Sequence, residues 1–315
     1  MPGIGFPGPF GFGGAATGNL YRAVTDDDAA GAIAAAWAEG VRWFDTAPHY
    51  GLGLSERRLG EALAGVPRDE FVLSTKVGRL LVPDPGGASR RDDEGFDVPA
   101  DSRRVRDYSR DGVLRSLDAS LARLGTDRID VVLVHDPDDY YRQALDEALP
   151  ALLDLRAQGV IRAVGVGMNQ WRLPARFVEH SDLDVVLLAG RYTLLDSSAA
   201  DVLLPACRER GVAVIAAGVF NSGILATDRP SAGARYDYRP AGSESVARAT
   251  RIAQVCERHG CVLPRAALWF PLRHAAVTTL CVGARSAEEV RRNAALLRDP
   301  VPEDLWRDLA EEGLL

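Results

Sequence analysis

The stretch SRDGVLRSLDASLARLG at residues 109–125, followed by IDVVLVH at residues 129–135, decides the fold class of this chain. The first part has the pattern of a helix over Ser109–Leu124 that stops at Gly125, and the second part is a run of mostly aliphatic residues. A glycine that ends a helix just before a strand is typical of the connections in α/β proteins. A strand without polar alternation is covered on both faces, as in a parallel sheet. This unit therefore predicts a parallel α/β fold.

The same alternation of helix and strand runs along most of the 315 residues. Further helical patterns cover Asp26–Glu39, Ala144–Gln158 and Ala199–Arg210, and each ends at a glycine before a strand-like run. The predicted strands lie at Phe10–Ala16, Val41–Asp45, Phe71–Lys76, Ile129–His135, Val160–Val166, Asp184–Leu188, Val212–Ala216 and Val277–Val282. This pattern predicts an α/β fold of the (β/α)8 TIM barrel type, with residues 1–315 as a single domain. A doubly wound sheet is the alternative, but no helical pattern follows the glycine-rich segment Gly11–Gly14, as a dinucleotide-binding fingerprint requires.

Two long connections interrupt the regular alternation, at Val77–Tyr108 and Val219–Ser243. Each follows a predicted strand, so both are expected at the C-terminal face of the barrel, where barrel enzymes build their active sites. Long connections in a compact domain are usually lids or binding loops. We therefore expect these two segments to shape the substrate site.

The overall charge argues against two classes of partner. The net charge is −7 and the pI is near 5.4, which disfavours nucleic acid and anionic membranes. No apolar stretch approaches the ~20 residues of a membrane span. The four cysteines predict reduced thiols in a cytoplasmic protein. Cys256, His259 and Cys261 match no standard zinc spacing, so no metal site is predicted there.

Polar residues close three of the predicted strands, and one of them is the only lysine of the chain. Asp45, Lys76 and His135 each end a strand-like run, and Tyr50 follows Asp45 in a Pro/Gly turn. Neighbouring strand ends in a barrel lie about 5 Å apart, so these side chains can converge. An ammonium stabilises a phenolate and lowers its pKa, and a carboxylate keeps the ammonium charged. The histidine can then hydrogen-bond the substrate oxygen.

Other interpretations of these residues remain open. Each of them alone is more simply a loop anchor or a packing residue, and only their combination favours catalysis. A barrel with one strand-end lysine also suits a Schiff-base aldolase in which Lys76 is the nucleophile. A non-catalytic nucleotide-binding subunit is a third possibility, which the full set of four polar residues argues against.

Several motifs resemble those of the aldo-keto reductases, over about residues 18–297. The most specific is Phe44-Asp45-Thr46-Ala47-Pro48-His49-Tyr50-Gly51, and it is followed by Ser55-Glu56 and Leu59-Gly60. Ser74-Thr75-Lys76-Val77-Gly78 and Val134-His135-Asp136-Pro137 match the lysine and histidine segments of that family. The resemblance implies a barrel that binds a nicotinamide cofactor, with Asp45, Tyr50, Lys76 and His135 as catalytic residues.

Further segments resemble the aldose 1-dehydrogenase branch of this family. They are Gly18-Asn19-Leu20-Tyr21, Gly165–Asn169, Arg191–Leu195 and Phe220-Asn221-Ser222-Gly223. The resemblance implies oxidation of an aldose at C1 to its lactone, with a small sugar or aldehyde as the substrate. A general NADPH-dependent aldehyde or ketone reductase and a pyridoxal 4-dehydrogenase are the alternatives within the family. None of these sequence motifs indicates whether the protein is a monomer or an oligomer.

The resemblance also implies where the nicotinamide end of the cofactor binds. The residues at these positions are Asn169, Gly218, Phe220, Asn221 and Gly223. Two family residues are replaced, because the usual carboxamide-binding glutamine falls at Ala189 and the ring-stacking tyrosine at Ala217. Asn169 is therefore expected to bind the carboxamide, and Phe220 to cover the ring.

The adenosine end is expected at Gly283, Arg285, Glu289 and Asn293, in a segment that resembles the family's adenosine-binding motif. This segment opens a predicted helix over Ala287–Leu297, whose N-terminal N–H groups suit anionic oxygens. NADP-preferring relatives carry a lysine and an arginine where this chain has Gly283 and Glu289. A carboxylate repels a phosphate and accepts from ribose hydroxyls, so NAD is favoured. NADP stays possible through Arg285.

Overall fold

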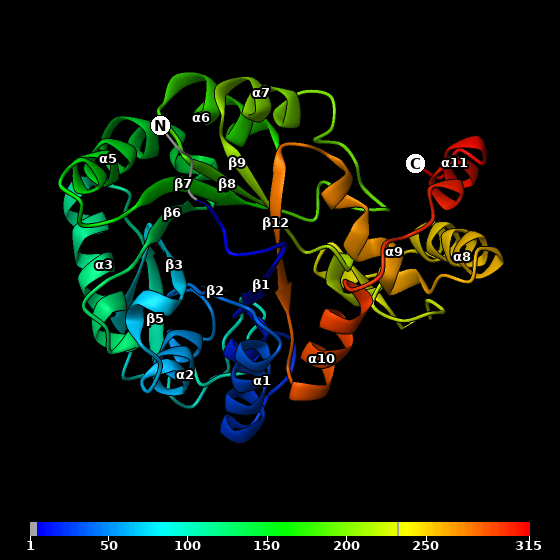
Figure 1. Ribbon diagram of the computed structural model, residues 1–315. Coiled ribbons are helices and arrows are strands. Elements are labelled where there is room, and N and C mark those ends of the chain that lie inside the picture. The colour runs from blue at the N-terminus through cyan, green and yellow to red at the C-terminus, as the bar shows by residue number, and fades with distance from the viewer. Residues whose placement is uncertain (1–4, 232) are drawn as a thin grey trace.

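The computed structural model describes residues 5–231 and 233–315, and its centre is a closed barrel of parallel strands (Figure 1). The barrel order is β1-β12-β9-β8-β7-β6-β3-β2, and β1 closes it by pairing with both β2 and β12. The strands are β1 (Phe10–Gly13), β2 (Trp43–Asp45), β3 (Val72–Val77), β6 (Val131–His135), β7 (Ala163–Met168), β8 (Val185–Ala189), β9 (Ala213–Ala217) and β12 (Val277–Gly283). All eight predicted strands are therefore present, and the predicted barrel is confirmed.

Most helices surround the barrel in Figure 1. The helices are α1 (Asp26–Ala38), α2 (Leu54–Leu63), α3 (Arg110–Leu124), α4 (Tyr141–Gln143), α5 (Leu149–Ala157), α6 (Arg172–His180), α7 (Leu203–Arg210), α8 (Ser243–Arg258), α9 (Leu263–Trp269), α10 (Ala287–Leu296) and α11 (Glu303–Glu311). Of these, α8 and α11 lie beyond α9 and α10 on the right of Figure 1. The predicted helix ends are set by caps, since the hydroxyl of Thr25 accepts from the Asp28 N–H at 3.1 Å and Gly125 ends α3 with φ +62°. The helix predicted over 144–158 is π-helical from Ala144 to Ala148 before α5 begins. No helix of the described residues is long and apolar enough to cross a membrane.

The barrel interior is filled by side chains from alternate strand positions. Trp43 is fully buried and occupies the space next to β1, where a Cβ on Gly11 would lie 1.7 Å from the Trp43 ring. Only glycine permits this approach of strand to ring. Larger apolar clusters fill the layer between strands and helices, and a separate cluster joins α8, α9 and α11.

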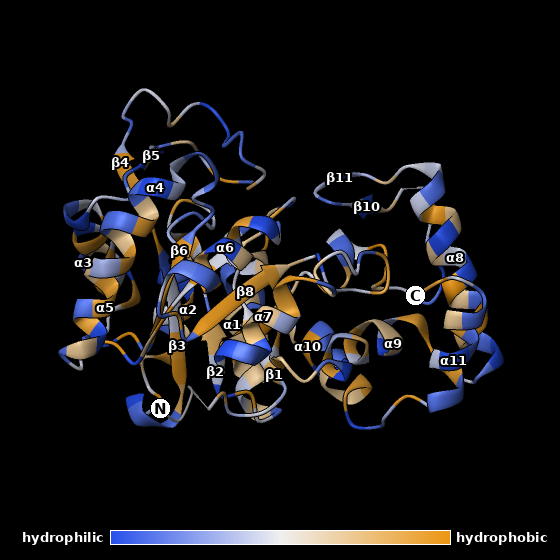
Figure 2. Cartoon of the chain, turned by 90° about the horizontal axis from the view of Figure 1, so that it is seen from above, coloured by the Kyte–Doolittle hydropathy of each residue, from blue (hydrophilic) through white to orange (hydrophobic). Residues whose placement is uncertain are grey.

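The two long connections each contain a hairpin that was not predicted. The first holds β4 (Arg79–Pro83) and β5 (Ser102–Arg106), and the second holds β10 (Arg235–Tyr236) and β11 (Arg239–Pro240). Both hairpins lie on the same side of the molecule in Figure 2. Since β3 and β9 lead into them, this is the C-terminal side of the barrel, as expected for active-site loops.

Candidate active site

The four polar residues proposed as catalytic lie together at the C-terminal ends of three adjacent strands. Asp45 ends β2, Lys76 lies near the end of β3, and His135 ends β6. The order β2-β3-β6 in the barrel makes these strands neighbours. Tyr50, from the turn after β2, places its ring centroid 4.7 Å from the Nζ of Lys76 and 5.9 Å from the His135 ring.

Lys76 and Asp45 form a buried ion pair at the base of the site. The Nζ of Lys76 donates to Oδ2 of Asp45 at 2.7 Å and to the carbonyl of Thr46 at 2.9 Å. The other carboxylate oxygen of Asp45 accepts from the Ser74 hydroxyl at 2.7 Å. Burial alone would lower the pKa of Lys76, but the charge and hydrogen bond of Asp45, together with Tyr50 and Cys281, outweigh burial and the net pKa is raised. Lys76 is therefore a fixed cation at neutral pH.

The phenol of Tyr50 stays protonated at neutral pH. Burial raises its pKa to about 12, and the charge of Lys76 offsets only part of that rise. Lys76 therefore lowers this pKa as expected, but burial outweighs its charge, so the net pKa lies above the ordinary value of a phenol. The cause is the loss of solvation, which the sequence pattern does not reveal.

His135 is a neutral imidazole. Its pKa is held well below the usual range by burial, and then by the positive charges of Arg79 and Lys76. The His49 ring, 5.5 Å away, is neutral for the same reasons. Among the described residues the Nδ1 atoms of both histidines are buried without a partner. Two neutral imidazoles therefore lie beside Tyr50, with ring centroids 6.0 and 5.9 Å from its ring, and can hydrogen-bond a ligand without adding charge.

Several residues around this centre were not predicted. His49 lies inside the motif that contains Tyr50, so its position was a usable signal. Cys281 on β12 lies with its Sγ 3.9 Å from Oδ2 of Asp45 and closes the interior side of the ion pair. Arg104 on β5 donates to the His49 carbonyl at 2.9 Å, and no motif marks that arginine.

The residues expected at the nicotinamide end surround the ends of β7 and β9. Asn169 follows β7, and its side-chain oxygen accepts from the Tyr238 hydroxyl at 3.3 Å. Gly218 follows β9 with φ +61°, and Gly223 has φ +106°. Asn221 is buried with its Oδ1 unpartnered among the described residues.

The two alanines that replace the family's glutamine and tyrosine lie side by side. Ala189 and Ala217 are paired residues at the ends of β8 and β9. Phe220 is half-buried and packs against both large core clusters. That Phe220 covers the nicotinamide ring stays a prediction.

Three of the residues expected at the adenosine end, Gly283, Arg285 and Glu289, lie around the start of α10, and Asn293 lies further along that helix. The Ser286 hydroxyl accepts from the Glu289 N–H at 3.2 Å, and the Glu289 carboxylate accepts from the Arg285 N–H at 2.8 Å. This reciprocal pair fixes the carboxylate at the helix start. Asn293 is buried with an unpartnered Oδ1 among the described residues, and Gly283 ends β12.

These positions fit a nicotinamide dinucleotide. Since β12 pairs with β9, the end of β12 at Gly283 lies beside the end of β9 that precedes Gly218. Asn221 and Asn293 each keep a buried side-chain oxygen without a partner among the described residues, and the start of α10 offers N–H groups for anionic oxygens. The residues expected at both ends of the cofactor therefore border one side of the barrel mouth.

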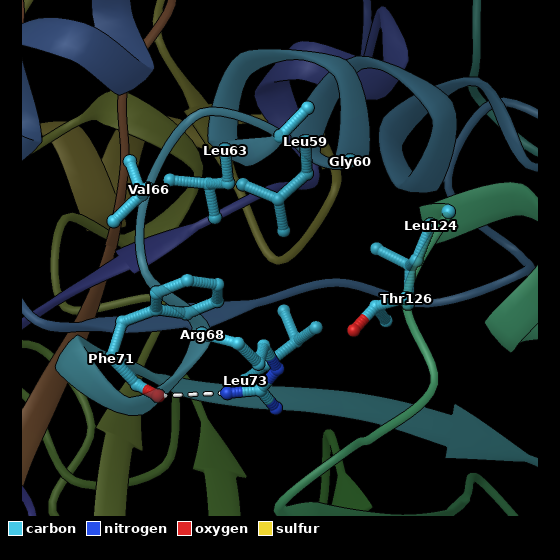
Figure 3. Close-up of a pocket in the computed structure, with 11 residues that line it drawn as sticks. Leu59, Gly60, Leu63, Val66, Arg68, Phe71, Leu73, Leu124 and Thr126 are labelled. Atoms are coloured by element: carbon cyan, nitrogen blue, oxygen red, sulfur yellow. Dashed lines mark hydrogen bonds between the residues drawn. The ribbon is translucent and has the colours of Figure 1, made fainter.

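A cavity of about 130 Å³ lies away from this centre (Figure 3). It is lined by side chains of α2, the start of β3 and the end of α3, among them Leu59, Leu73 and Leu124. At the edge of this cavity, Arg68 donates to the Phe71 carbonyl at 2.9 Å. Because Phe71 and Leu73 lie at the opposite end of β3 from Lys76, this cavity is not part of the candidate active site.

The fold and the residues at its mouth define a (β/α)8-barrel oxidoreductase. The chain belongs to the aldo/keto reductase family, whose model matches residues 9–311. It therefore acts on carbonyl and hydroxyl groups of a small molecule, with a nicotinamide cofactor. Bound at these strand ends, such a cofactor supplies a carbon that accepts or gives up a hydride.

Two characterised relatives align with almost the whole chain. A D-threo-aldose 1-dehydrogenase from a Pseudomonas species is 46% identical over 97% of this chain and 94% of the relative. A pyridoxal 4-dehydrogenase from Microbacterium luteolum is 40% identical over 97% of this chain and 94% of the relative. Among solved structures, an aldo-keto reductase from Bacillus halodurans is 25% identical, with a TM-score of 0.73 and coverage of 96% and 91%. A glycerol dehydrogenase from Gluconobacter oxydans, 24% identical with a TM-score of 0.77 and coverage of 99% and 94%, shares the fold.

Proposed function

We propose that this protein oxidises C1 of a neutral aldose in its ring form to the lactone, with NAD as the preferred cofactor. The main support is the buried Lys76–Asp45 pair beside a protonated Tyr50 and a neutral His135. The 46% identical D-threo-aldose 1-dehydrogenase supports the choice of substrate class.

In this proposal the C1 hydroxyl binds between Tyr50 and His135. Tyr50 takes the hydroxyl proton during oxidation and returns it during reduction. The charge of Lys76 stabilises the phenolate, and Asp45 keeps that charge in place. The neutral imidazole of His135 hydrogen-bonds the same oxygen and orients it.

Two functions are alternatives to aldose oxidation: oxidation of pyridoxal, and Schiff-base chemistry on Lys76. The 40% identical pyridoxal 4-dehydrogenase keeps oxidation of pyridoxal as a second candidate function. The Schiff-base mechanism is disfavoured, because Lys76 is held charged by Asp45 and a charged amine is no nucleophile. Borohydride with substrate should therefore leave the mass of the protein unchanged.

A cytoplasmic location is also proposed, supported by four cysteines that are all buried free thiols.

We expect neutral aldoses to be far better substrates than simple alcohols. A site built to bind hydroxyl groups rejects analogues that lack them by up to about 10⁴-fold, since its buried polar groups then stay unpaired. L-fucose, L-galactose and D-arabinose with NAD should therefore be oxidised to lactones, which hydrolyse to aldonic acids detectable by mass. A much higher kcat/KM for simple aromatic aldehydes with NADPH would replace this proposal with the general reductase. A much higher kcat/KM for pyridoxal would favour the second candidate.

Glu289→Arg should shift the cofactor preference from NAD toward NADP. A well-placed arginine can bind the 2′-phosphate through a charge-assisted contact, so the NADP/NAD ratio of kcat/KM should rise about 10- to 100-fold. The matched variant Glu289→Gln retains a side-chain acceptor for the Arg285 N–H and removes only the negative charge. It should give a smaller rise in the same ratio.

The cofactor preference of the wild-type protein can contradict this prediction. A preference for NADP in the unmodified protein would reject NAD as the natural cofactor. It would identify Arg285, half-buried beside the start of α10, as a phosphate ligand already in place.

A further inference from the structure

A carboxylate from the β4–β5 connection lies above the proposed catalytic residues without a close partner. The Oε2 of Glu94 is 3.7 Å from Nη1 of Arg79 and 3.9 Å from Nδ1 of His49, and its Oε1 is 3.7 Å from Nη1 of Arg104. None of these three distances is a hydrogen bond. Gaps of this size between polar groups are commonly bridged by a hydroxyl group or a water molecule.

The donors around Glu94 are held in place by other acids. Arg79 donates to Asp136 at 2.6 Å, and Arg104 donates to Asp92 at 2.5 Å. Both arginine side chains are buried, and their Nε atoms lack a partner among the described residues. The group therefore combines fixed donors with one carboxylate that remains available as an acceptor.

This group borders the proposed reaction centre. The ring of His49 lies 5.5 Å from the ring of His135 and 6.0 Å from that of Tyr50. Phe96, two residues after Glu94, packs against both His49 and Tyr50 with ring centroids 5.1 and 6.0 Å away. The segment that carries Glu94 is thus anchored directly next to Tyr50.

The charges of the group favour a neutral ligand. The positive charges of Arg79 and Arg104 are each matched by a hydrogen-bonded carboxylate, and the negative charge of Glu94 is balanced by Arg106, whose charge also acts on His49. His49 adds none, because burial and the two arginines hold its pKa well below the usual range. The group as a whole carries no net charge, so it offers no surplus positive charge to an anionic substrate. A hydroxyl group both donates and accepts, so it suits a carboxylate that faces N–H donors.

We propose that Glu94, with Arg79, Arg104 and His49, forms a subsite that binds the hydroxyl groups of the sugar remote from C1. This assignment rests on the proposed aldose oxidation and names the residues that select a polyhydroxylated substrate. A sugar hydroxyl that lies to one side of these atoms donates to Glu94 and accepts from an arginine or histidine N–H, and so bridges atoms that are 3.7–3.9 Å apart. The tight Arg79–Asp136 and Arg104–Asp92 pairs stay intact.

The test compares one substrate that has remote hydroxyls with one that lacks them. In Glu94→Ala, the KM for L-fucose oxidation should rise about 10- to 100-fold, the loss typical of a hydrogen bond to a charged group, while kcat stays within about threefold. Reduction of propanal with NADH should keep its kcat/KM within about twofold, because propanal has no hydroxyl for Glu94. Glu94→Gln should lose less than Glu94→Ala, since an amide oxygen still accepts.

Asp93→Ala is the matched control. Asp93 is the exposed acid next to Glu94, and it makes no side-chain hydrogen bond or ion pair within residues 5–231 and 233–315. This variant should leave both reactions unchanged. Equal losses on L-fucose and propanal in Glu94→Ala would show a structural role and overturn the subsite, as would no loss on L-fucose. A wild-type protein that reduces propanal but oxidises no aldose would overturn the proposed function itself, before any variant is made.

Discussion

Tyr50→Phe is expected to lower kcat for aldose oxidation by about 10²- to 10⁴-fold, the usual contribution of a positioned acid or base. The substitution removes only the hydroxyl, so the packing of the ring against Phe96 and Lys76 is retained. The dissociation constant of NADH, measured by fluorescence titration, should change by less than about threefold. Normal turnover in this variant would reject Tyr50 as the proton-transfer group.

The pH dependence of the wild-type protein should follow from the same phenol. Oxidation needs the deprotonated form, and a pKa raised to about 12 leaves little of that form at neutral pH. The rate of oxidation should therefore rise as the pH increases through the alkaline range. Reduction needs the protonated form, which is abundant at pH 7, so its rate should fall only at the alkaline end. In Tyr50→Phe the remaining oxidation should lose this pH dependence.

The barrel and its central residues could be predicted because local sequence determines them. A glycine stop followed by an aliphatic run marks the units that end at Gly40, Gly125, Gly159 and Gly211, and all eight expected strands are present. Asp45, Lys76 and His135 were expected to converge because they end strands that are neighbours in the barrel. Parallel strands bring their C-terminal ends to one face of the barrel. The position of a residue at the end of a predicted strand was therefore enough to place it in the site.

The rim of the site could not be predicted, because it depends on contacts between distant segments. The two strands of the β4–β5 hairpin contain four arginines, at positions 79, 103, 104 and 106, which is not the usual composition of strands. The meeting of Glu94 with Arg79, Arg104 and His49 follows from the way this hairpin folds over the barrel. The net rise in the pKa of Tyr50 could not be predicted for a related reason, since the burial that outweighs Lys76 comes from the packed site and not from the neighbouring residues in the motif.

Lys76→Arg is expected to lower kcat by about 10²- to 10⁴-fold while the protein stays folded and binds NADH. Arginine keeps the positive charge, but its larger planar group does not fit the compact space between Asp45 and the Tyr50 ring. Because Lys76 is 1% exposed, a misfolded variant would also be inactive, so a second variant is needed. Lys76→Met combined with Asp45→Asn removes both charges together and leaves no unpaired ion in the interior, so its thermal midpoint should stay near that of the wild type. A folded double variant without activity, together with an inactive Lys76→Arg, would assign the loss to chemistry. More than about a tenth of the wild-type kcat in either variant would remove Lys76 from the mechanism.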